Sequence, residues 1–186
     1  MSFEQPADRR IQKTLSALRE AFFELVLSQS YDEISVSDII EKANVGRSTF
    51  YQHFKSKDDI LVASMHYPLS NLSMAVAFED STESLLHLME HFWENRQFAP
   101  RIFGGSARKH VVASLTDMIE SQLKVASSQG IIISIPLRLA AHQLAESQLV
   151  IIIDWLTGKA HCDAQTMAKH LRKSSVALRD SILTTR

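Results

Sequence analysis

The ten-residue stretch VGRSTFYQHF, from Val45 to Phe54, concentrates side chains that could recognise a nucleic acid. It contains one arginine, three hydroxyl groups and a histidine. An arginine can donate two hydrogen bonds to guanine, and hydroxyl groups can bond to bases or phosphates. Phe50 and Phe54 are four residues apart, a spacing that puts both rings on one face of a helix. The spacing therefore predicts a short helix with a buried aromatic face and a polar face free for DNA.

A second pattern, HLMEH from His87 to His91, matches the H-x-x-E-H arrangement of inverted zinc peptidases. Two histidines one helical turn apart can chelate zinc, and Glu90 would be the general base. The apolar residues around Leu85 and Met89 predict a buried face, which would leave His87, Glu90 and His91 in solvent. A zinc peptidase is therefore the third alternative, and we expect these residues to be solvated.

Other combinations that could carry chemistry are weak. The triplet HCD, residues 161–163, offers ligand atoms, but its expected role is to cap the last helix. Gly104 and Gly105 fall short of a nucleotide-binding loop, and no nucleophile is paired with a base. The sequence therefore predicts a protein that is not an enzyme and that needs no metal and no cofactor.

Helical periodicity predicts the elements that would position the first stretch. Apolar residues recur at steps of three and four on one expected helix, at Ile11, Leu15, Leu18, Phe22 and Leu25. Asp8 is its expected N-cap, and a short helix follows from SVSDIIEKA, with a capping box at Ser35 and Asp38. After the break at KANVG, RSTFYQHF predicts another short helix. Two short helices joined by a tight turn and packed on a longer one describe a helix-turn-helix.

The rest of the chain is also predicted to be helical. Ser56 and Asp59 form a capping pair for a helix that Pro68 should end or kink. Longer helices are expected to follow, with Ser134 as an N-cap, Pro136 in the first turn after it, and Asp163 capping the last helix. The run IIISI has the composition of a strand, but no partner strand is evident.

Composition limits the class of protein. The chain has 186 residues, 45% hydrophobic and 22% charged, with a net charge of −1. Its single cysteine suits a reducing cytosol. Because there is no apolar signal segment and no run of about 20 apolar residues, we expect a cytoplasmic protein with no membrane partner. Basic residues are concentrated locally, since residues 42–57 hold four Lys or Arg and no acidic residue.

The segment from RRIQKTLSALREAFFELVL through YDEISVSDIIEKANVGRSTFYQHFKSKDDIL, residues 9–61, resembles the DNA-binding domain of the TetR family of bacterial transcriptional regulators. The resemblance implies an all-α fold, with a helix-turn-helix DNA-binding domain over residues 1–56. Residues 57–186 would form a helical ligand-binding and dimerisation domain. One departure is Gly46, where many members carry a polar side chain, and this puts a base contact at that position in doubt.

The resemblance also implies which residues contact DNA. Arg47, Ser48 and Thr49 would read bases. Tyr51, His53 and Lys57 would contact phosphates, as would Ser37 near the start of the second helix. Arg9 and Lys13, one turn apart on the first helix, add positive charge that would favour phosphates.

Family members act as homodimers that read palindromic DNA, and many release it when a small molecule binds. The apolar run LVIIIDWL predicts a helix covered on all sides, either by a partner subunit or as the central helix of a monomer. The expected interface residues are Leu149, Ile152, Leu156, Leu171 and Leu178. The expected residues of an effector pocket are Met65, Tyr67, Met89, Phe92, Trp93, Phe103 and Trp155. The sequence thus favours a repressor released from its operator by a small-molecule effector; the alternative is a regulator that needs no ligand or answers to a protein partner.

Overall fold

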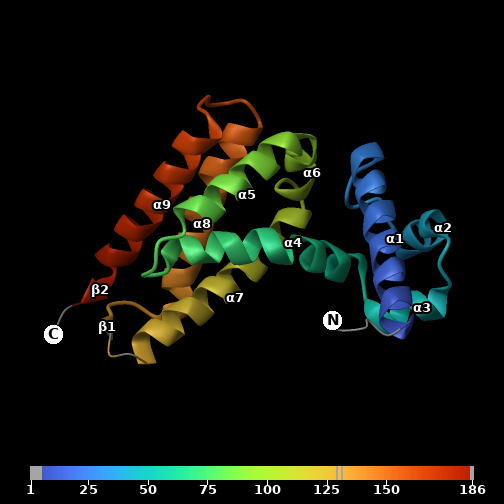
Figure 1. Cartoon of the computed structure of the whole chain (residues 1–186), viewed down its shortest axis with the longest axis horizontal. Helices are drawn as coiled ribbons and strands as arrows, with labels where there is room; N and C mark the ends of the chain where they lie inside the picture. Colours follow the sequence, from blue (N-terminus) through green and yellow to red (C-terminus); the bar gives the residue numbers. More distant parts are fainter. Residues whose placement is uncertain (1–5, 129, 131, 185–186) are drawn as a thin grey trace.

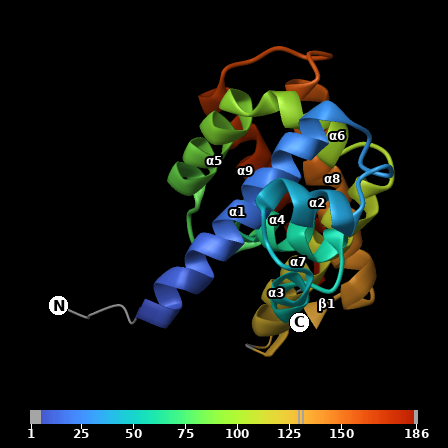
Figure 2. The same ribbon diagram turned by 90° about the vertical axis from the view of Figure 1, so that its right-hand side faces the viewer.

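The N-terminal lobe consists of three helices that cross one another closely. The computed structural model describes residues 6–128, 130 and 132–184. The lobe contains α1 (Pro6–Ser28), α2 (Val36–Ala43) and α3 (Arg47–His53), and it forms the right-hand part of the molecule in Figure 1. Viewed from that side, α2 and α3 lie in front of α4, with α1 running diagonally beside them (Figure 2). The predicted all-α fold with an N-terminal helix-turn-helix is confirmed.

Local signals set the boundaries of these helices. The Ser35 hydroxyl accepts a hydrogen bond from the Asp38 amide, and the Asp38 carboxylate accepts one from the Ser35 amide, so the predicted capping box is present. The turn into α3 passes through Asn44 in the left-handed region, at φ 50°. Asparagine tolerates that conformation better than most residues. At the other end, α1 begins at Pro6, so Asp8 lies within the helix and is not its N-cap.

Helix α4 (Lys57–Ser73) connects the two lobes (Figure 1). The Ser56 hydroxyl accepts a hydrogen bond from the Asp59 amide, as the capping pair predicts. Pro68 does not end the helix, which continues for another turn beyond it. The proline ring is buried in the core, so its packing offsets the loss of one backbone hydrogen bond.

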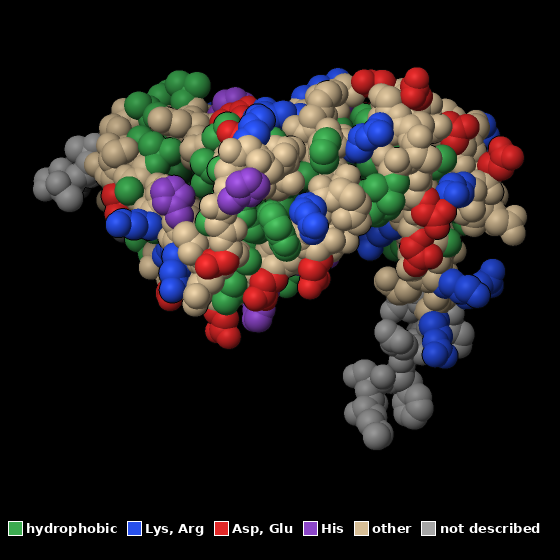
Figure 3. Space-filling model, turned by 90° about the horizontal axis from the view of Figure 1, so that it is seen from above, with side chains coloured by type: hydrophobic (Ala, Val, Ile, Leu, Met, Phe, Trp, Pro, Cys, Tyr) green, Lys and Arg blue, Asp and Glu red, His purple; other side chains and the backbone are tan. Residues whose placement is uncertain are grey.

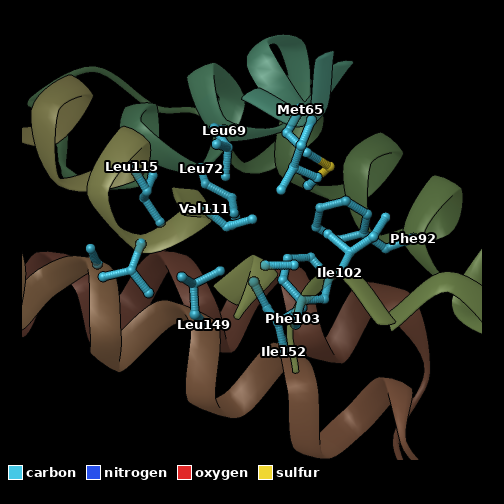
Figure 4. Packing of buried hydrophobic residues seen from close by; sticks show 14 of the residues in the cluster. Met65, Leu69, Leu72, Phe92, Ile102, Phe103, Val111, Leu115, Leu149 and Ile152 are labelled. Atoms are coloured by element: carbon cyan, nitrogen blue, oxygen red, sulfur yellow. The ribbon is translucent and has the colours of Figure 1, made fainter. Parts of the chain in front are cut away.

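The C-terminal lobe packs five α-helices and two 3-10 turns around one apolar core. They are η1 (Met74–Val76), α5 (Thr82–Glu94), η2 (Arg96–Phe98), α6 (Ala99–Ile102), α7 (Ala107–Ser128), α8 (Leu137–Leu156) and α9 (Ala164–Ser181). The Asp163 carboxylate accepts a hydrogen bond from the Thr166 amide and caps α9 as predicted. Side chains from α4, α5, α6, α7 and α8 meet in the centre of this lobe (Figure 4).

A small antiparallel pairing joins the α7–α8 connection to the segment that follows α9. The strand β1 (Ile132–Ile133) lies in the IIISI run and pairs with β2 (Leu183–Thr184), a partner that the sequence did not reveal. The Ser134 amide and hydroxyl both donate to the Ile182 carbonyl, each at 2.9 Å. Ser134 is therefore part of this pairing and does not cap α8, which begins at Leu137 after Pro136.

The predicted interface residues are mostly interior to one protomer. Leu149, Ile152 and Leu171 are 0% exposed and Leu156 is 6% exposed, while Leu178 is half-buried. Figure 4 shows Leu149 and Ile152 pointing from α8 into the core shared with α4 and α7. Side chains that are already enclosed have no surface left for a partner subunit. The assignment of the four buried leucine and isoleucine residues to a dimer interface is therefore wrong.

The surface carries both signs of charge. On the face seen in Figure 3, Lys and Arg side chains are interspersed with Asp and Glu over both lobes. Any attraction to a polyanion must therefore come from a local arrangement of groups.

Among the described residues, no helix combines the length and the apolar character that crossing a bilayer requires.

Candidate nucleic-acid interface

Helix α3 is fixed in the lobe by its aromatic face. Phe50 is 0% exposed and Phe54 is 6% exposed, and their ring centroids lie 6.0 Å apart. Both belong to the same buried cluster as Phe22 of α1 and Ile39 of α2. The predicted burial of the aromatic pair is confirmed, and it holds the opposite face of α3 in one orientation.

That opposite face is polar and open to solvent. Arg47, Ser48 and Gln52 are exposed, and Tyr51 is 50% exposed. Thr49 and His53 are half-buried at the edges of the helix. Hydroxyl, amide and guanidinium groups on one exposed helical turn are the groups that hydrogen-bond base edges and phosphates. Gln52 belongs to this surface although it was not among the predicted contacts.

Arg47 and Ser37 are brought together across the turn between α2 and α3. The Nη2 atom of Arg47 donates a hydrogen bond to Oγ of Ser37 at 2.9 Å. A guanidinium has five N–H donors, so this contact leaves enough donors for a bidentate pair with guanine. Gly46 precedes Arg47 at φ −65°, a conformation open to any residue, and a Cβ there would make only ordinary contacts.

The side chain of Lys57 turns away from this surface. Its Nζ donates to the carbonyl oxygens of Tyr31 at 2.6 Å, Asp32 at 3.2 Å and Ile34 at 2.8 Å. It also lies 4.6 Å from the centroid of the Tyr31 ring. An ammonium group has three donors, and all three are occupied. The prediction that Lys57 contacts a phosphate is corrected: Lys57 holds the α1–α2 loop against α4.

We expect Lys57→Met to lower stability without changing how DNA binding depends on salt. Loss of the bonds from Nζ should reduce the free energy of unfolding by about 1–3 kcal/mol, measured by urea denaturation. The matched control is Lys55→Met, because Lys55 is exposed beside α3. Lys55→Met should lower the salt slope of binding by about one unit. A lower slope for Lys57→Met with unchanged stability would contradict the loop-anchoring role.

Arg9 and Lys13 are exposed on the first turns of α1. Their side chains lie one turn apart and add positive charge to the N-terminal lobe. Lys42 and Lys55 are also exposed, and all four cations could attract a phosphate backbone. Lys42 also pairs with Glu24 at 2.7 Å.

A cavity of about 490 Å³ lies where the two lobes meet. Its wall comes from α1, α4, α5, η2, α6 and the end of α8. Of the predicted pocket residues, Met65, Phe92 and Phe103 line it. Its volume falls in the range of roughly 300–1,000 Å³ typical of sites for small molecules.

The other predicted pocket residues lie elsewhere. Tyr67 is 74% exposed, and Trp93 is 38% exposed with its ring stacked on that of Trp155 at 5.1 Å. Trp155 and Met89 are buried, but neither lines the cavity. These four residues therefore lie outside this cavity, because their side chains fill the core or cover it.

Arg19 and Ser64 line the cavity and were not predicted. The sequence did contain a signal that this side of α1 faces a cavity. Phe23 and Leu27 are apolar and four residues apart, but they lie off the main apolar stripe that contains Phe22. Phe23 contacts Phe98 of η2 edge-on, with ring centroids 5.2 Å apart. No local pattern marks Ser64, because its place in the cavity wall depends on how α1, α5 and α6 pack around α4.

Polar contacts beside the cavity connect the lobes. The Tyr31 hydroxyl donates to the Asp58 carboxylate, and His110 Nε2 of α7 lies 3.4 Å from the same carboxylate. Burial, followed by the neighbouring Asp58 carboxylate, raises the pKa of Tyr31 well above its usual value. Ser106 donates to Asp32 in the α1–α2 loop. A movement at the start of α7 would therefore displace the α1–α2 loop and the start of α4 through these contacts.

The HLMEH pattern does not form a cluster of metal ligands. His87 and Glu90 are exposed and lie 3.4 Å apart, while His91 contacts Asn95. Across the described parts of the chain, three or more metal-ligating side chains are nowhere grouped closely enough to hold an ion. The predicted exposure of His87, Glu90 and His91 is confirmed.

The three-helix lobe and the exposed face of α3 together define a helix-turn-helix protein. Within that class, residues 18–63 match the sequence profile described as "Bacterial regulatory proteins, tetR family". This match confirms the resemblance seen in the sequence, and it spans the second half of α1, α2, α3 and the start of α4.

Individual relatives agree with this assignment. The HTH-type transcriptional regulator YxbF of Bacillus subtilis (strain 168) is 41% identical over 59 residues, which cover 31% of this chain and 16% of YxbF. DhaS of Lactococcus lactis subsp. lactis (strain IL1403), an HTH-type activator of the dhaKLM operon, is 30% identical over 96 residues, 48% of this chain and 49% of DhaS. The chain thus spans half or less of the length of these curated relatives.

The whole fold is similar to a solved structure. The crystal structure of a TetR transcriptional regulator from Streptococcus agalactiae 2603V superposes with a TM-score of 0.60 at 25% identity. The match covers 91% of this chain and 97% of that one. The similarity therefore extends beyond the N-terminal lobe to the helical C-terminal lobe.

Proposed function

We propose that the chain is a homodimeric transcriptional regulator that binds a palindromic operator in the cytoplasm, where the DNA is. Its DNA-binding domain would cover residues 1–56, and its regulatory and dimerisation domain residues 57–186. The observation that carries this proposal is the exposed polar face of α3, held outward by the buried Phe50 and Phe54. Transcriptional regulation, rather than catalysis, is the activity that such a surface supports.

Contacts to bases and to the DNA backbone divide along α3 and its neighbours. Arg47, Ser48 and Thr49 would read base edges from the start of α3 in the major groove. Tyr51 and His53 would contact phosphates, as would Ser37 at the start of α2. Arg9 and Lys13 would add sequence-independent attraction from α1.

A small-molecule effector would occupy the cavity between the lobes and release the operator, as a repressor requires. Met89 and Trp155 are packed within the C-terminal core. The cavity between the lobes lies instead against α1, whose position sets that of α3. An effector that prefers one arrangement of the lobes would shift the population toward it. A cavity at this location favours a regulator whose DNA binding is controlled by a ligand over one that needs no ligand.

The partner subunit would pack on the outward face of α8. Leu139 and Val150 are eleven residues apart, about three turns, and therefore share a face. They are 60% and 48% exposed, so this face of α8 presents apolar side chains to solvent. This face replaces the buried residues that the sequence indicated.

We expect Val150→Asp to yield monomers, because a charge at the centre of an apolar contact loses its hydration when the partner packs on it. Light scattering should report half the mass of the unaltered protein, with helical content retained. Val125→Asp is the matched control, since Val125 is 57% exposed on α7 and outside the proposed contact. A dimeric Val150→Asp protein would contradict this interface.

The proposed function is tested by selecting binding sites from random duplex DNA. The selected sequences should contain two half-sites related by two-fold symmetry. Their centres should lie one helical turn apart or a multiple of it, about 34 Å per turn. If no sequence is enriched over random DNA, or if the enriched site has no symmetry, the proposal fails.

A further inference from the structure

The cavity between the lobes contains polar groups that have no partner. The Nε of Arg19 and the hydroxyl of Ser64 are buried, and neither makes a hydrogen bond within the described residues. Both residues line the cavity, Arg19 from α1 and Ser64 from α4. A buried polar group without a partner destabilises the fold. Two unpartnered donors in the wall of one cavity indicate that a ligand supplies the missing acceptor.

The charges around the cavity indicate which kind of ligand would fit. Two carboxylates line the same wall, but each has a partner in the protein. Glu20 Oε1 accepts from the Ser16 hydroxyl at 2.9 Å, and Glu24 Oε2 pairs with Lys42 at 2.7 Å. Arg19 has no ion-pair partner among the described residues. A hydroxyl hydrogen bond leaves Glu20 charged, so the preference for an anionic acceptor rests on the buried donors of Arg19 and Ser64 and not on the net charge of the wall.

The rest of the wall is apolar. Phe23 and Leu27 come from α1, Met65 and Pro68 from α4, and Phe98 and Phe103 from the segment around α6. Such a wall favours a ligand with a hydrophobic body, since each CH₂ group removed from water strengthens binding. A free phosphate or a small polar acid would leave this surface uncovered.

We propose that this cavity binds a monocarboxylic acid with an apolar body, with Arg19 and Ser64 donating hydrogen bonds to the carboxylate. Charge-assisted bonds of this kind are about twice as strong as neutral ones. The bound acid would contact α1 on one side and α4 and α6 on the other. Its role as the effector rests on the proposed function, but its binding does not.

The test uses calorimetry on the full chain with three probes that share one chain length. These are sodium decanoate, decan-1-ol and decyltrimethylammonium, each kept below its micelle concentration. We expect decanoate to bind once per chain, decanol at least tenfold more weakly, and the cation not at all. Equal binding of the anion and the cation would overturn the proposal, as would the absence of decanoate binding.

Variants identify the groups that hold the carboxylate. Arg19→Met should weaken decanoate binding by roughly 10- to 100-fold, the effect of one bond to a charged group, while decanol binding stays the same. Arg101→Met is the control, since Arg101 is exposed on α6 outside the cavity and should bind decanoate normally. If Arg19→Met does not fold, Ser64→Ala should still weaken decanoate selectively. Unchanged decanoate affinity in these variants would overturn the assignment.

The two proposals fail in different ways. If decanoate does not bind but an operator is selected, the carboxylate site is wrong and DNA reading by α3 stands. If decanoate binds through Arg19 but no operator is selected, the proposed function is wrong and the site stands. Decanoate that binds without releasing the operator would overturn only its role as effector.

Discussion

Phe50→Ala is expected to lower the free energy of unfolding of the N-terminal lobe by about 3–5 kcal/mol. The ring is 0% exposed and packs against Phe54 and Tyr51, with centroids 6.0 and 5.2 Å away. Because the lobe is small, a cavity of this size leaves little stability in reserve. Urea denaturation followed by circular dichroism measures the loss, and operator binding should fall with it.

The matched comparison is Tyr51→Ala, one residue further along α3. Tyr51 is 50% exposed, so its removal should cost less than about 1 kcal/mol of stability. If both variants were equally stable, Phe50 would not be the anchor that orients α3. If Phe50→Ala retained full stability, the outward placement of Arg47 would have no structural basis.

What the sequence revealed of the helix-turn-helix depended on interactions between near neighbours. The capping box of Ser35 and Asp38 spans three residues, and the Phe50–Phe54 pair spans four, so a residue pattern is enough to predict them. The same holds for the caps at Ser56 and Asp163. These signals fix where helices begin and which side is buried. In this lobe they predicted the start of α2 and the buried side of α3, whereas Asp8 was wrongly expected to cap α1.

Contacts between distant segments were not predictable in this way. A lysine three residues beyond Phe54 looks like a DNA contact in the sequence, but Lys57 reaches carbonyl groups more than 20 residues earlier. The strand partner of Ile132–Ile133 lies about 50 residues away. The cavity likewise depends on how α1 packs against α6, which no local pattern encodes.

The interface prediction shows a second limit of residue patterns. An apolar helix such as α8 must be covered on every side, but the pattern does not say which side its own protomer covers. Leu149 and Ile152 face that protomer's core, whereas Val150, between them in the sequence, faces outward. Apolar character alone therefore does not distinguish the face that packs in the protomer from the face that is open to a partner.

Arg47→Ala is expected to lower operator affinity by about 1–3 kcal/mol for each half-site, the discrimination of one bidentate arginine–guanine pair. Arg47 is exposed at the first position of α3, where a recognition helix meets base edges. Both protomers of a dimer would lose the contact, so the two losses should roughly add. Titration of the selected operator in a gel-shift assay measures the effect.

The decisive feature is selectivity among DNA sequences. Arg47→Ala should accept any base at one position of each half-site, while binding to random DNA changes little. Ser37→Ala is the control, because it removes only the hydroxyl that receives the Arg47 hydrogen bond at 2.9 Å. That variant should keep the base preference and lose less affinity, since the guanidinium remains. Equal losses on operator and random DNA for Arg47→Ala would mean that Arg47 contacts the phosphate backbone, and base reading would then belong to other residues of α3.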